Sequence, residues 1–269
     1  MNQKLLDTKL EELTNIILKL KKVVIAFSGG VDSTFLATIS YQILGDNATA
    51  ITIDIPQLPQ DELEEAKHIA ADLGIPHYIV DRDQIDVSWF ENNPKDRCYI
   101  CKKINLNAVV KFCQEKGIEG VMIEGTNFDD LDDYRPGFQA VKELGIRSPL
   151  LEAKITKNEI RQLSKQLGLN CWDKPSSPCL ATRFPFGEKI TPEKLNIVYE
   201  AEKILKALGL KDVRVRVHGK IARIEIAKQH FDIIFKETGK ITDELKALGF
   251  EFVTLDLSGY RKGSMNREI

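Results

Sequence analysis

The first half of the chain alternates between amphipathic helical patterns and short apolar runs. In its opening segment apolar residues recur every three to four positions with charges between them, which predicts an amphipathic helix. The apolar positions are Leu6, Leu10, Leu13, Ile17 and Leu20. Short apolar runs with the length and composition of buried strands follow at 23–27, 48–55, 77–81 and 121–125. Helical patterns separate these runs at 33–43, 59–73 and 99–116.

This order of elements predicts an α/β fold with a doubly wound parallel sheet. Strands that alternate with helices form βαβ units, whose crossovers are right-handed. Ligands of such sheets bind beyond the carboxyl ends of the strands. The loops after Phe27, Ile55, Asp81 and Gly125 are therefore expected to meet at one site.

The second half of the chain has a different pattern. Thr156 and Glu159 make a capping-box pattern, which predicts a helix that ends near residue 167. Residues 170–189 contain prolines and a glycine without a steady period, and we interpret them as a functional loop or a hinge. The segments 212–217 and 221–227 alternate strictly between apolar and polar residues, which predicts a β-hairpin with one solvated face.

Three regions are therefore expected along the chain. Residues 1–169 are predicted to form the doubly wound nucleotide-binding domain, and residues 170–190 a cysteine-bearing active-site loop. Residues 191–269 are predicted to form a small α+β domain for substrate binding or oligomerisation, whose first helix opens with Thr191 at the N-cap and Pro192 in the first turn.

Composition narrows the class of protein. The 269 residues carry a net charge of -2, so the overall charge gives no reason to expect a nucleic-acid or membrane partner. The opening amphipathic pattern differs from a signal peptide, and no apolar run has the length of a membrane span. We expect a cytoplasmic protein, in which the five cysteines are free thiols and not disulfides.

The sequence Ser28-Gly29-Gly30-Val31-Asp32-Ser33 lies between a predicted strand and a predicted helix. Glycines allow a tight turn and a close approach of the backbone to a ligand, and the helix N-terminus favours a phosphate or pyrophosphate. The hydroxyls of Ser28 and Ser33 add hydrogen-bond donors. Asp32 fits beside an anion if it holds a metal ion or caps the helix. The alternative is an ordinary strand–helix turn.

This loop and the preceding VVIAF run resemble the pyrophosphate loop (PP-loop) of the N-type ATP pyrophosphatases. The resemblance implies cleavage of ATP between the α and β phosphates and adenylation of a substrate oxygen. Six further segments, in the same order over nearly the whole chain, resemble the LarE-type sulfur transferases that help to build the nickel-pincer nucleotide cofactor. These segments are 97–102, 124–127, 132–137, 174–183, 214–216 and 259–266.

The family resemblance implies a specific reaction and specific residues. Such proteins use ATP and Mg²⁺ to adenylate the carboxylates of a pyridinium biscarboxylic acid mononucleotide, and then replace oxygen by sulfur. Cys179 occupies the sulfur-donor position, and Asp32 and Arg214 complete the expected catalytic set. Relatives also imply a homo-oligomer and an external sulfide donor. The loop residues Ser28, Gly29, Gly30, Asp32 and Ser33, together with Thr126, Arg135 and Arg216, are expected to bind nucleotide or substrate.

Cys98 and Cys101 form a C-x-x-C pair that the single-cysteine family pattern lacks. With Cys179 they could hold a 4Fe-4S cluster and leave one iron free to carry sulfide. A zinc site that adds Cys171 to these three is an alternative. A second alternative is a redox-active pair, with Cys179 consumed as the sulfur donor. Otherwise we expect Cys171 to be structural, and Cys113 to be a core residue.

Charged residues elsewhere allow two interpretations. Arg214 and Arg216 project from one face of a predicted strand, which is either a solvated face or a phosphate-binding one, with Glu202 and Glu225 in the same region. The acidic run 129–133 either binds Mg²⁺ or is an exposed loop. The four histidines show no ligand spacing.

Two other functions remain open at this stage. A tRNA thiolase of the same superfamily would need a strongly basic surface or an added RNA-binding module, and a net charge of -2 argues against both. A non-catalytic ATP-binding sensor or iron–sulfur carrier would bind nucleotide without releasing pyrophosphate.

Overall fold

The computed structural model describes residues 3–55, 60–81, 88–132, 136–175, 179–210 and 212–261. The chain forms two compact units, each with its own hydrophobic core. Unit 1 comprises Met1–Asp86 and Asp96–Ser177, and unit 2 comprises Val87–Lys95 and Pro178–Ile269. Within the described ranges, no helix is long and apolar enough to cross a membrane.

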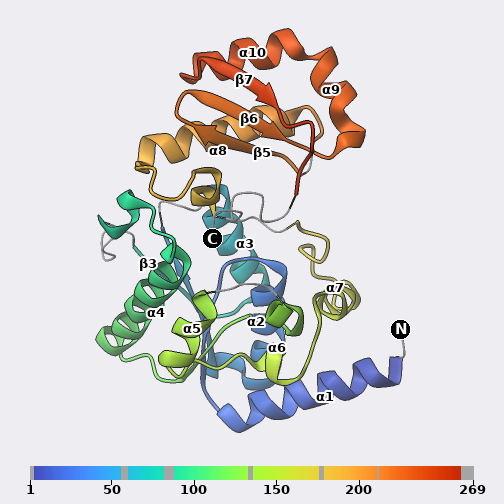
Figure 1. Cartoon of the computed structure of the whole chain (residues 1–269). Coiled ribbons are helices and arrows are strands. Elements are labelled where there is room, and N and C mark those ends of the chain that lie inside the picture. Colours follow the sequence, from blue (N-terminus) through green and yellow to red (C-terminus); the bar gives the residue numbers. More distant parts are fainter. Residues whose placement is uncertain are drawn as a thin grey trace. The chain divides into compact units, whose positions relative to one another are not determined.

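Unit 1 is built on a four-stranded parallel sheet, as the sequence predicts (Figure 1). Its strands are β1 (Val23–Ala26), β2 (Ala48–Ile53), β3 (His77–Val80) and β4 (Val121–Ile123). They lie in the order β3-β2-β1-β4, and every pairing is parallel. The chain steps outward from β1 to β3 and then returns to the far side of β1, so the winding reverses between β1 and β4. Such a reversal is where doubly wound sheets bind ligands.

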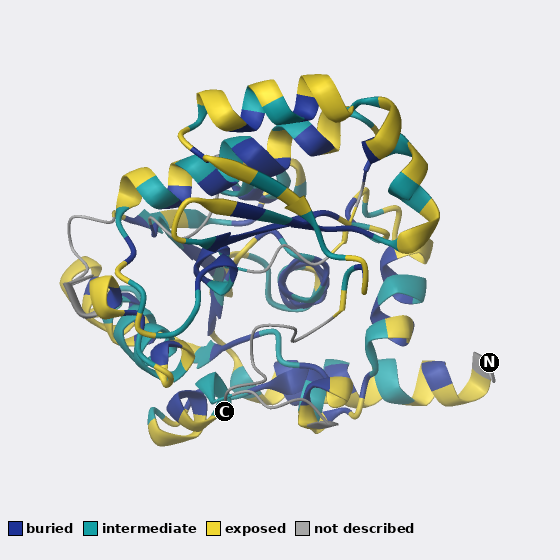
Figure 2. Ribbon diagram, turned by 45° about the horizontal axis from the view of Figure 1, so that its top comes forward, coloured by how far each residue is buried: buried dark blue, intermediate teal, exposed yellow. Residues whose placement is uncertain are grey.

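Helices cover both faces of this sheet. Successive residues of a strand point to opposite faces, so one strand contributes side chains to the core on each side. Val23 and Ile25 of β1 belong to one core, whereas Ala26 packs on a second core that contains Leu106 and Val141. Helix α1 carries buried and exposed residues on opposite sides (Figure 2), whereas every residue from Ser33 to Ser40 of α2 is buried. The helices of unit 1 are α1 (Gln3–Leu20), α2 (Val31–Leu44), α3 (Gln60–Leu73), α4 (Arg97–Lys116), α5 (Gly137–Glu143), α6 (Pro149–Glu152) and α7 (Lys157–Gln166).

Local signals fix the ends of these helices. The capping box of α7 is confirmed: the Thr156 hydroxyl accepts from the Glu159 amide, and the Glu159 carboxylate accepts from the Thr156 amide. Gly117 ends α4 in the left-handed conformation, with φ of 65°. The predicted first residue of α3, Pro59, lies outside the described residues.

Helix α4 begins at Arg97, two residues before the predicted start at Tyr99. The earlier start places Cys98 in the first turn of the helix and Cys101 one turn later. Residues three apart on a helix are neighbours on its surface, so the two thiols lie on one side of the N-terminal end of α4.

Unit 2 is a smaller α+β unit. Its three-stranded sheet has the order β5-β6-β7, in which β5 and β6 are antiparallel and β6 and β7 are parallel. The segment 88–95 belongs to this unit: the Asn93 side-chain amide donates to the Pro185 carbonyl, and the Ile190 amide donates to the Glu91 carbonyl. Its elements are α8 (Pro192–Ala207), β5 (Arg214–His218), β6 (Ile221–Glu225), α9 (Phe231–Lys236), α10 (Thr238–Ala247) and β7 (Phe252–Leu255).

The predicted hairpin of unit 2 is confirmed, but its polar face is not solvated. Arg214 is 6% exposed, Arg216 5% and Glu225 0%. The alternation in the sequence reflects one buried apolar face and one largely buried charged face. Burial of Arg216 and Glu225 is possible because the two side chains form an ion pair, at 3.0 Å, and Arg223 pairs with the same carboxylate at 2.9 Å.

Candidate active site

The PP-loop closes on itself at the carboxyl end of β1. The Ser28 and Ser33 hydroxyls lie 3.1 Å apart, and the Ser33 hydroxyl donates to the Gly30 carbonyl at 3.1 Å. Gly30 is the N-cap of α2 and makes no side-chain cap. The first amides of a helix have no partner within it, so this loop and helix end form an anion-binding site.

Two glycines of this site are required by close packing. Gly29 has φ of 67°, and a Cβ atom there would lie 3.0 Å from the Cα of Ala66 on α3. At Gly125, after β4, a Cβ atom would lie 3.1 Å from the Ser33 amide nitrogen. Side chains at either position would push the loop away from α3 or cover the start of α2.

Asp32 lies in the first turn of α2, on the wall of the cavity described next. One carboxylate oxygen, Oδ2, is 2.6 Å from Lys157 Nζ. The other, Oδ1, is buried and has no hydrogen-bond partner among the described residues. Asp32 does not cap α2. Of the two roles that the sequence allowed, an orphaned carboxylate oxygen fits a hard cation such as Mg²⁺.

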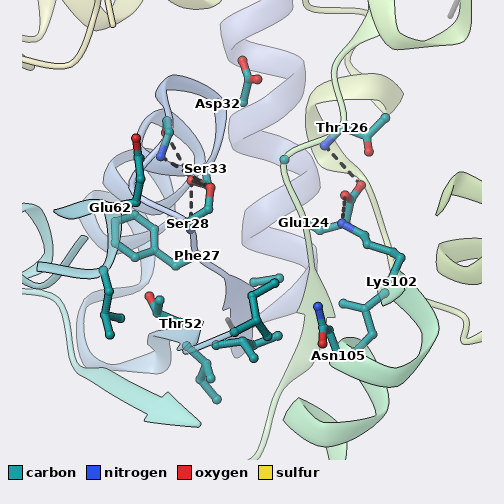
Figure 3. Close-up of a pocket in the computed structure, with 18 of the residues that line it drawn as sticks. Phe27, Ser28, Asp32, Ser33, Thr52, Glu62, Lys102, Asn105, Glu124 and Thr126 are labelled. Atoms are coloured by element: carbon teal, nitrogen blue, oxygen red, sulfur yellow. Dashed lines mark hydrogen bonds and ion pairs between the residues drawn. The ribbon is translucent and has the colours of Figure 1, made fainter. Parts of the chain in front are cut away.

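A cavity of about 310 Å³ opens beside the loop, in the size range of small-molecule sites (Figure 3). Its lining comes from the ends of β1, β2 and β4 and from helices α2, α3 and α4. The segments after Phe27 and after β4 meet here as predicted, whereas residues 56–59 and 82–87 of the other two predicted loops lie outside the described residues. The lining combines apolar groups, which suit an aromatic base, with polar groups that suit phosphates. The apolar groups include Phe27, Ile51, Ile53, Ile55, Leu63 and Leu106.

Glu124 organises the β4 side of the cavity. Its carboxylate accepts from the Ser148 hydroxyl at 2.6 Å, from the Thr126 amide at 3.1 Å and from Lys102 Nζ at 3.1 Å. Burial alone would raise the pKa of Glu124, but the charge of Lys102 and these hydrogen bonds together lower it below the usual value. Glu124 is therefore a buried carboxylate that holds the backbone of the predicted site residue Thr126 (Figure 3).

Helix α4 carries the C-x-x-C pair and also contributes to the lining of the cavity. Lys102 and Asn105 line the cavity, and the Asn105 side-chain amide donates to Cys101 Sγ at 3.3 Å. Cys98 is exposed and Cys101 is partly buried. Both belong to unit 1, whereas Cys179 belongs to unit 2.

In unit 2 buried arginines gather around a loop that begins at Cys179. Arg183 makes a bidentate pair with Glu202, at 2.6 and 2.8 Å, and also donates to the Cys179 carbonyl at 3.3 Å. Arg216 pairs with Glu225 at 3.0 Å. The partly buried Cys179 therefore lies at the start of a backbone segment fixed by charge-assisted hydrogen bonds.

Arg214 differs from these two arginines. Its Nη1 donates to the Val213 carbonyl at 2.7 Å, and its guanidinium lies 5.3 Å from the centre of the Tyr260 ring. No carboxylate within the described ranges forms an ion pair with it. Burial, followed by the charge of Arg183, lowers its pKa. A buried guanidinium without a carboxylate favours an incoming anion.

The remaining predicted positions have mixed outcomes. Arg135 and Asp133 lie outside the described residues. Asp129 and Asp130 accept hydrogen bonds from the amides of Lys157 and Asn127, so both stabilise local backbone. Asp130 also lines the cavity.

All five cysteines are free thiols. Cys171 is buried and Cys113 partly buried, and burial raises the pKa of both thiols, which suits structural roles. Among the residues that the structure describes, no three Cys, His, Asp or Glu side chains are grouped as a metal site.

Several contacts that shape the site were not predicted from the sequence. Lys157 contacts Asp32, and Lys174 contacts Glu62, which lines the cavity. These two pairs join residues from different elements, and no spacing pattern marks them. Asn105 contacts Cys101 across one turn of α4, a pair that the i,i+4 spacing on a predicted helix could have indicated.

Comparisons with known proteins agree with this geometry. Residues 5–124 match the NAD synthase family. The chain is 44% identical to an uncharacterized protein of Synechocystis sp. over 98% of this chain and 99% of that protein. It is 36% identical to the pyridinium-3,5-bisthiocarboxylic acid mononucleotide synthase of Lactiplantibacillus plantarum over 97% and 95%. An uncharacterized protein of Methanocaldococcus jannaschii is 34% identical over 90% and 92%.

The fold and the loop thus define an ATP pyrophosphatase of the PP-loop class. Within that class, the 36% identity over nearly the full length of both chains shows that this chain belongs to the LarE-type family of ATP-dependent sulfurtransferases.

Substitution of Gly29 tests the packing of the loop. Gly29→Ala should weaken the binding of a non-hydrolysable ATP analogue by about tenfold or more, because left-handed strain of roughly 1–2 kcal/mol adds to a backbone contact with α3. Gly117→Ala is the matched control, since Gly117 has a similar φ and open space around it. Titration calorimetry measures the affinity. Equal losses in both variants would contradict a specific role for Gly29.

The Glu124 network makes stability depend on pH. The pKa of Glu124 is lower in the folded state, so its contribution is present above the unfolded pKa of about 4.3 and is lost as the pH falls through the folded pKa. Glu124→Gln should cost about 1–3 kcal/mol at pH 7, and this difference should shrink below about pH 4. Urea unfolding at several pH values measures it.

The control for Glu124→Gln is Glu119→Gln, which breaks an exposed pair with Lys22 and should change stability little. A difference between Glu124→Gln and the wild type that stays constant down to about pH 3 would contradict the assignment of a depressed pKa to Glu124.

Proposed function

We propose that this enzyme adenylates a carboxylate of pyridinium-3,5-biscarboxylic acid mononucleotide and replaces a carboxylate oxygen by sulfur, for the nickel-pincer nucleotide cofactor. The name of the Lactiplantibacillus plantarum relative supports this substrate class. The observation that carries the proposal is the buried Arg214, whose guanidinium has no carboxylate partner among the described residues and suits the substrate phosphate.

Adenylation is the first step of the proposed reaction. A substrate carboxylate oxygen attacks the α-phosphorus of ATP, and the bond between that phosphorus and the bridging oxygen breaks. The electron pair leaves with pyrophosphate. In this proposal the amides of the PP-loop and of the α2 N-terminus bind this leaving group, and Asp32 holds Mg²⁺, which neutralises charge on the phosphates. Oδ1 of Asp32, which is buried and has no hydrogen-bond partner among the described residues, supports this role.

Sulfur transfer is the second step. A sulfur nucleophile adds to the carbonyl carbon of the acyl adenylate and forms a carbon–sulfur bond. The carbon–oxygen bond to AMP then breaks, so AMP departs with an oxygen that belonged to the substrate. Activation is needed because a free carboxylate is a poor electrophile, whereas AMP is a good leaving group.

The sulfur is proposed to come from a 4Fe-4S cluster held by Cys98, Cys101 and Cys179. The donor set fits: all three are free thiols, and the first two lie on one side of a helix N-terminus, whose partial positive charge favours anionic ligands. Three thiolates leave one iron of such a cluster without a protein ligand, and that iron supplies a place for external sulfide.

The proposal also covers the location of the enzyme, its sulfur source and its assembly. Free thiols and the use of ATP favour a cytoplasmic location, and sustained turnover requires an external sulfide donor. We also expect a homo-oligomer, as in related proteins.

The proposed role of Arg214 predicts that its replacement weakens binding of the mononucleotide but not of ATP. Arg214→Met should raise the KM for the mononucleotide by about 10–100-fold, the value of a charge-assisted hydrogen bond, and leave ATP affinity unchanged. Substrate-dependent pyrophosphate release measures KM. The corresponding nucleoside without its phosphate is the control, because Arg214→Met should not weaken it further. An unchanged KM in the variant would contradict the proposed phosphate site.

The cluster is tested by anaerobic purification with absorption spectra and iron and sulfide analysis. Wild type and the control Cys113→Ala should be brown with a broad visible band, and Cys98→Ala should lose the band. Colourless, iron-free wild type after reconstitution would overturn the cluster. Bound zinc would then favour a zinc site, and loss of sulfur mass from Cys179 after one turnover would favour a consumed donor.

A further inference from the structure

Residues 171–174 form a turn that is attached to two helices of unit 1, α7 and α3. Arg161 of α7 donates one hydrogen bond to the Trp172 carbonyl at 2.9 Å and another to the Lys174 carbonyl at 2.8 Å. Lys165 of the same helix lies over the Trp172 ring, 4.5 Å from its centre. Cys171 is buried. This turn is therefore an ordered part of unit 1.

The attachment of this turn to α3 is made by the Lys174 side chain, which is only 14% exposed. Its Nζ lies 2.8 Å from Glu62 and 2.7 Å from Glu65, two carboxylates on adjacent turns of α3. Burial alone would lower the pKa of Lys174, but hydrogen bonds to both carboxylates raise it. Lys174 is held more firmly than the lysine of an exposed ion pair. The reason is that burial reduces the screening, by solvent, of its attraction to the two carboxylates.

Glu62 also lines the nucleotide cavity (Figure 3). A carboxylate at that wall would repel the phosphates of a bound nucleotide unless its charge were neutralised. Lys174 supplies that neutralisation. In the sequence, Lys174 stands five residues before the proposed sulfur-donor ligand Cys179. One side chain thus joins the wall of the nucleotide cavity to the start of the cysteine-bearing segment.

We infer that Lys174 is a positioning residue that couples nucleotide binding to the turn 171–174, at the start of the cysteine-bearing segment. A nucleotide in the cavity changes the electrostatic environment of Glu62, and the Glu62–Lys174 pair transmits this change to the turn 171–174. Loss of the pair should weaken nucleotide binding, because Glu62 is then not neutralised, and at saturating ATP it should lower sulfur transfer more than adenylation. The turnover consequence depends on the proposed function, whereas the coupling itself depends only on nucleotide binding.

Hydrogen exchange tests the coupling directly. The Trp172 amide donates to the Leu169 carbonyl and the Lys174 amide to the Cys171 carbonyl, so their exchange rates report on the turn. In wild type, a non-hydrolysable ATP analogue with Mg²⁺ should slow exchange at both amides by at least about fivefold, a modest coupling. In Lys174→Met, at a higher analogue concentration that calorimetry shows to be saturating, the analogue should no longer slow exchange at position 172.

Lys67→Met is the matched control, since it removes an exposed lysine paired with Glu64 on the same helix, and should behave as wild type. Lys174→Arg should restore the response, because a guanidinium can bridge two carboxylates. This variant also keeps the test valid if Lys174→Met folds poorly. Equal nucleotide-dependent protection in wild type and Lys174→Met, or none in wild type, would overturn the coupling.

A measurement of both reaction products distinguishes a positioning role of Lys174 from a purely structural one. Thiocarboxylate formed per pyrophosphate released should fall about fivefold or more in Lys174→Met and recover in Lys174→Arg. A parallel loss of both products would indicate a purely structural role and overturn the inference. If wild type forms no thiocarboxylate at all, the proposed function fails, and the exchange experiment still decides whether Lys174 couples nucleotide binding to the turn.

Discussion

Backbone amides can bind a pyrophosphate only where no side chain stands in front of them, and this steric constraint shapes unit 1. Gly29 packs against Ala66, and Gly125 packs against the amide of Ser33, so the loop, α2, α3 and the end of β4 must come together without intervening atoms. The parallel sheet satisfies the constraint because it brings the carboxyl ends of β1, β2 and β4 to one edge. The nucleotide cavity is a consequence of this packing.

Buried charge is the second organising feature. Glu124 in unit 1 and the pairs Arg183–Glu202 and Arg216–Glu225 in unit 2 are almost fully buried. Such pairs contribute little net stability, because desolvation offsets most of their attraction. These groups instead fix the positions of backbone segments. Glu124 accepts a hydrogen bond from the Thr126 amide, and Arg183 donates one to the Cys179 carbonyl. Arg214 forms no ion pair with a carboxylate in the described part of the chain, which supports its proposed role in binding the substrate phosphate.

The sequence predicts the elements of this fold well, because strands, helices and the Thr156 capping box depend on local patterns. The sequence does not predict which faces of the strands in unit 2 are buried. The alternation around Arg214 and Arg216 has the same period whether that face is solvated or buried. Nor does it identify the Lys157–Asp32 pair, whose partners are 125 residues apart, or the assignment of residues 88–95 to unit 2. Those features arise from tertiary packing alone.

The central claim is that ATP activates a carboxylate of the substrate itself. The most direct measurement uses substrate labelled with ¹⁸O in its carboxylates, followed by mass spectrometry of the nucleotide product. Adenylation followed by attack of sulfur at the carbonyl carbon predicts AMP that carries one ¹⁸O atom for each sulfur gained. Unlabelled AMP, or ADP in its place, would contradict the account, because the substrate carboxylate would then not have been the group that ATP activates.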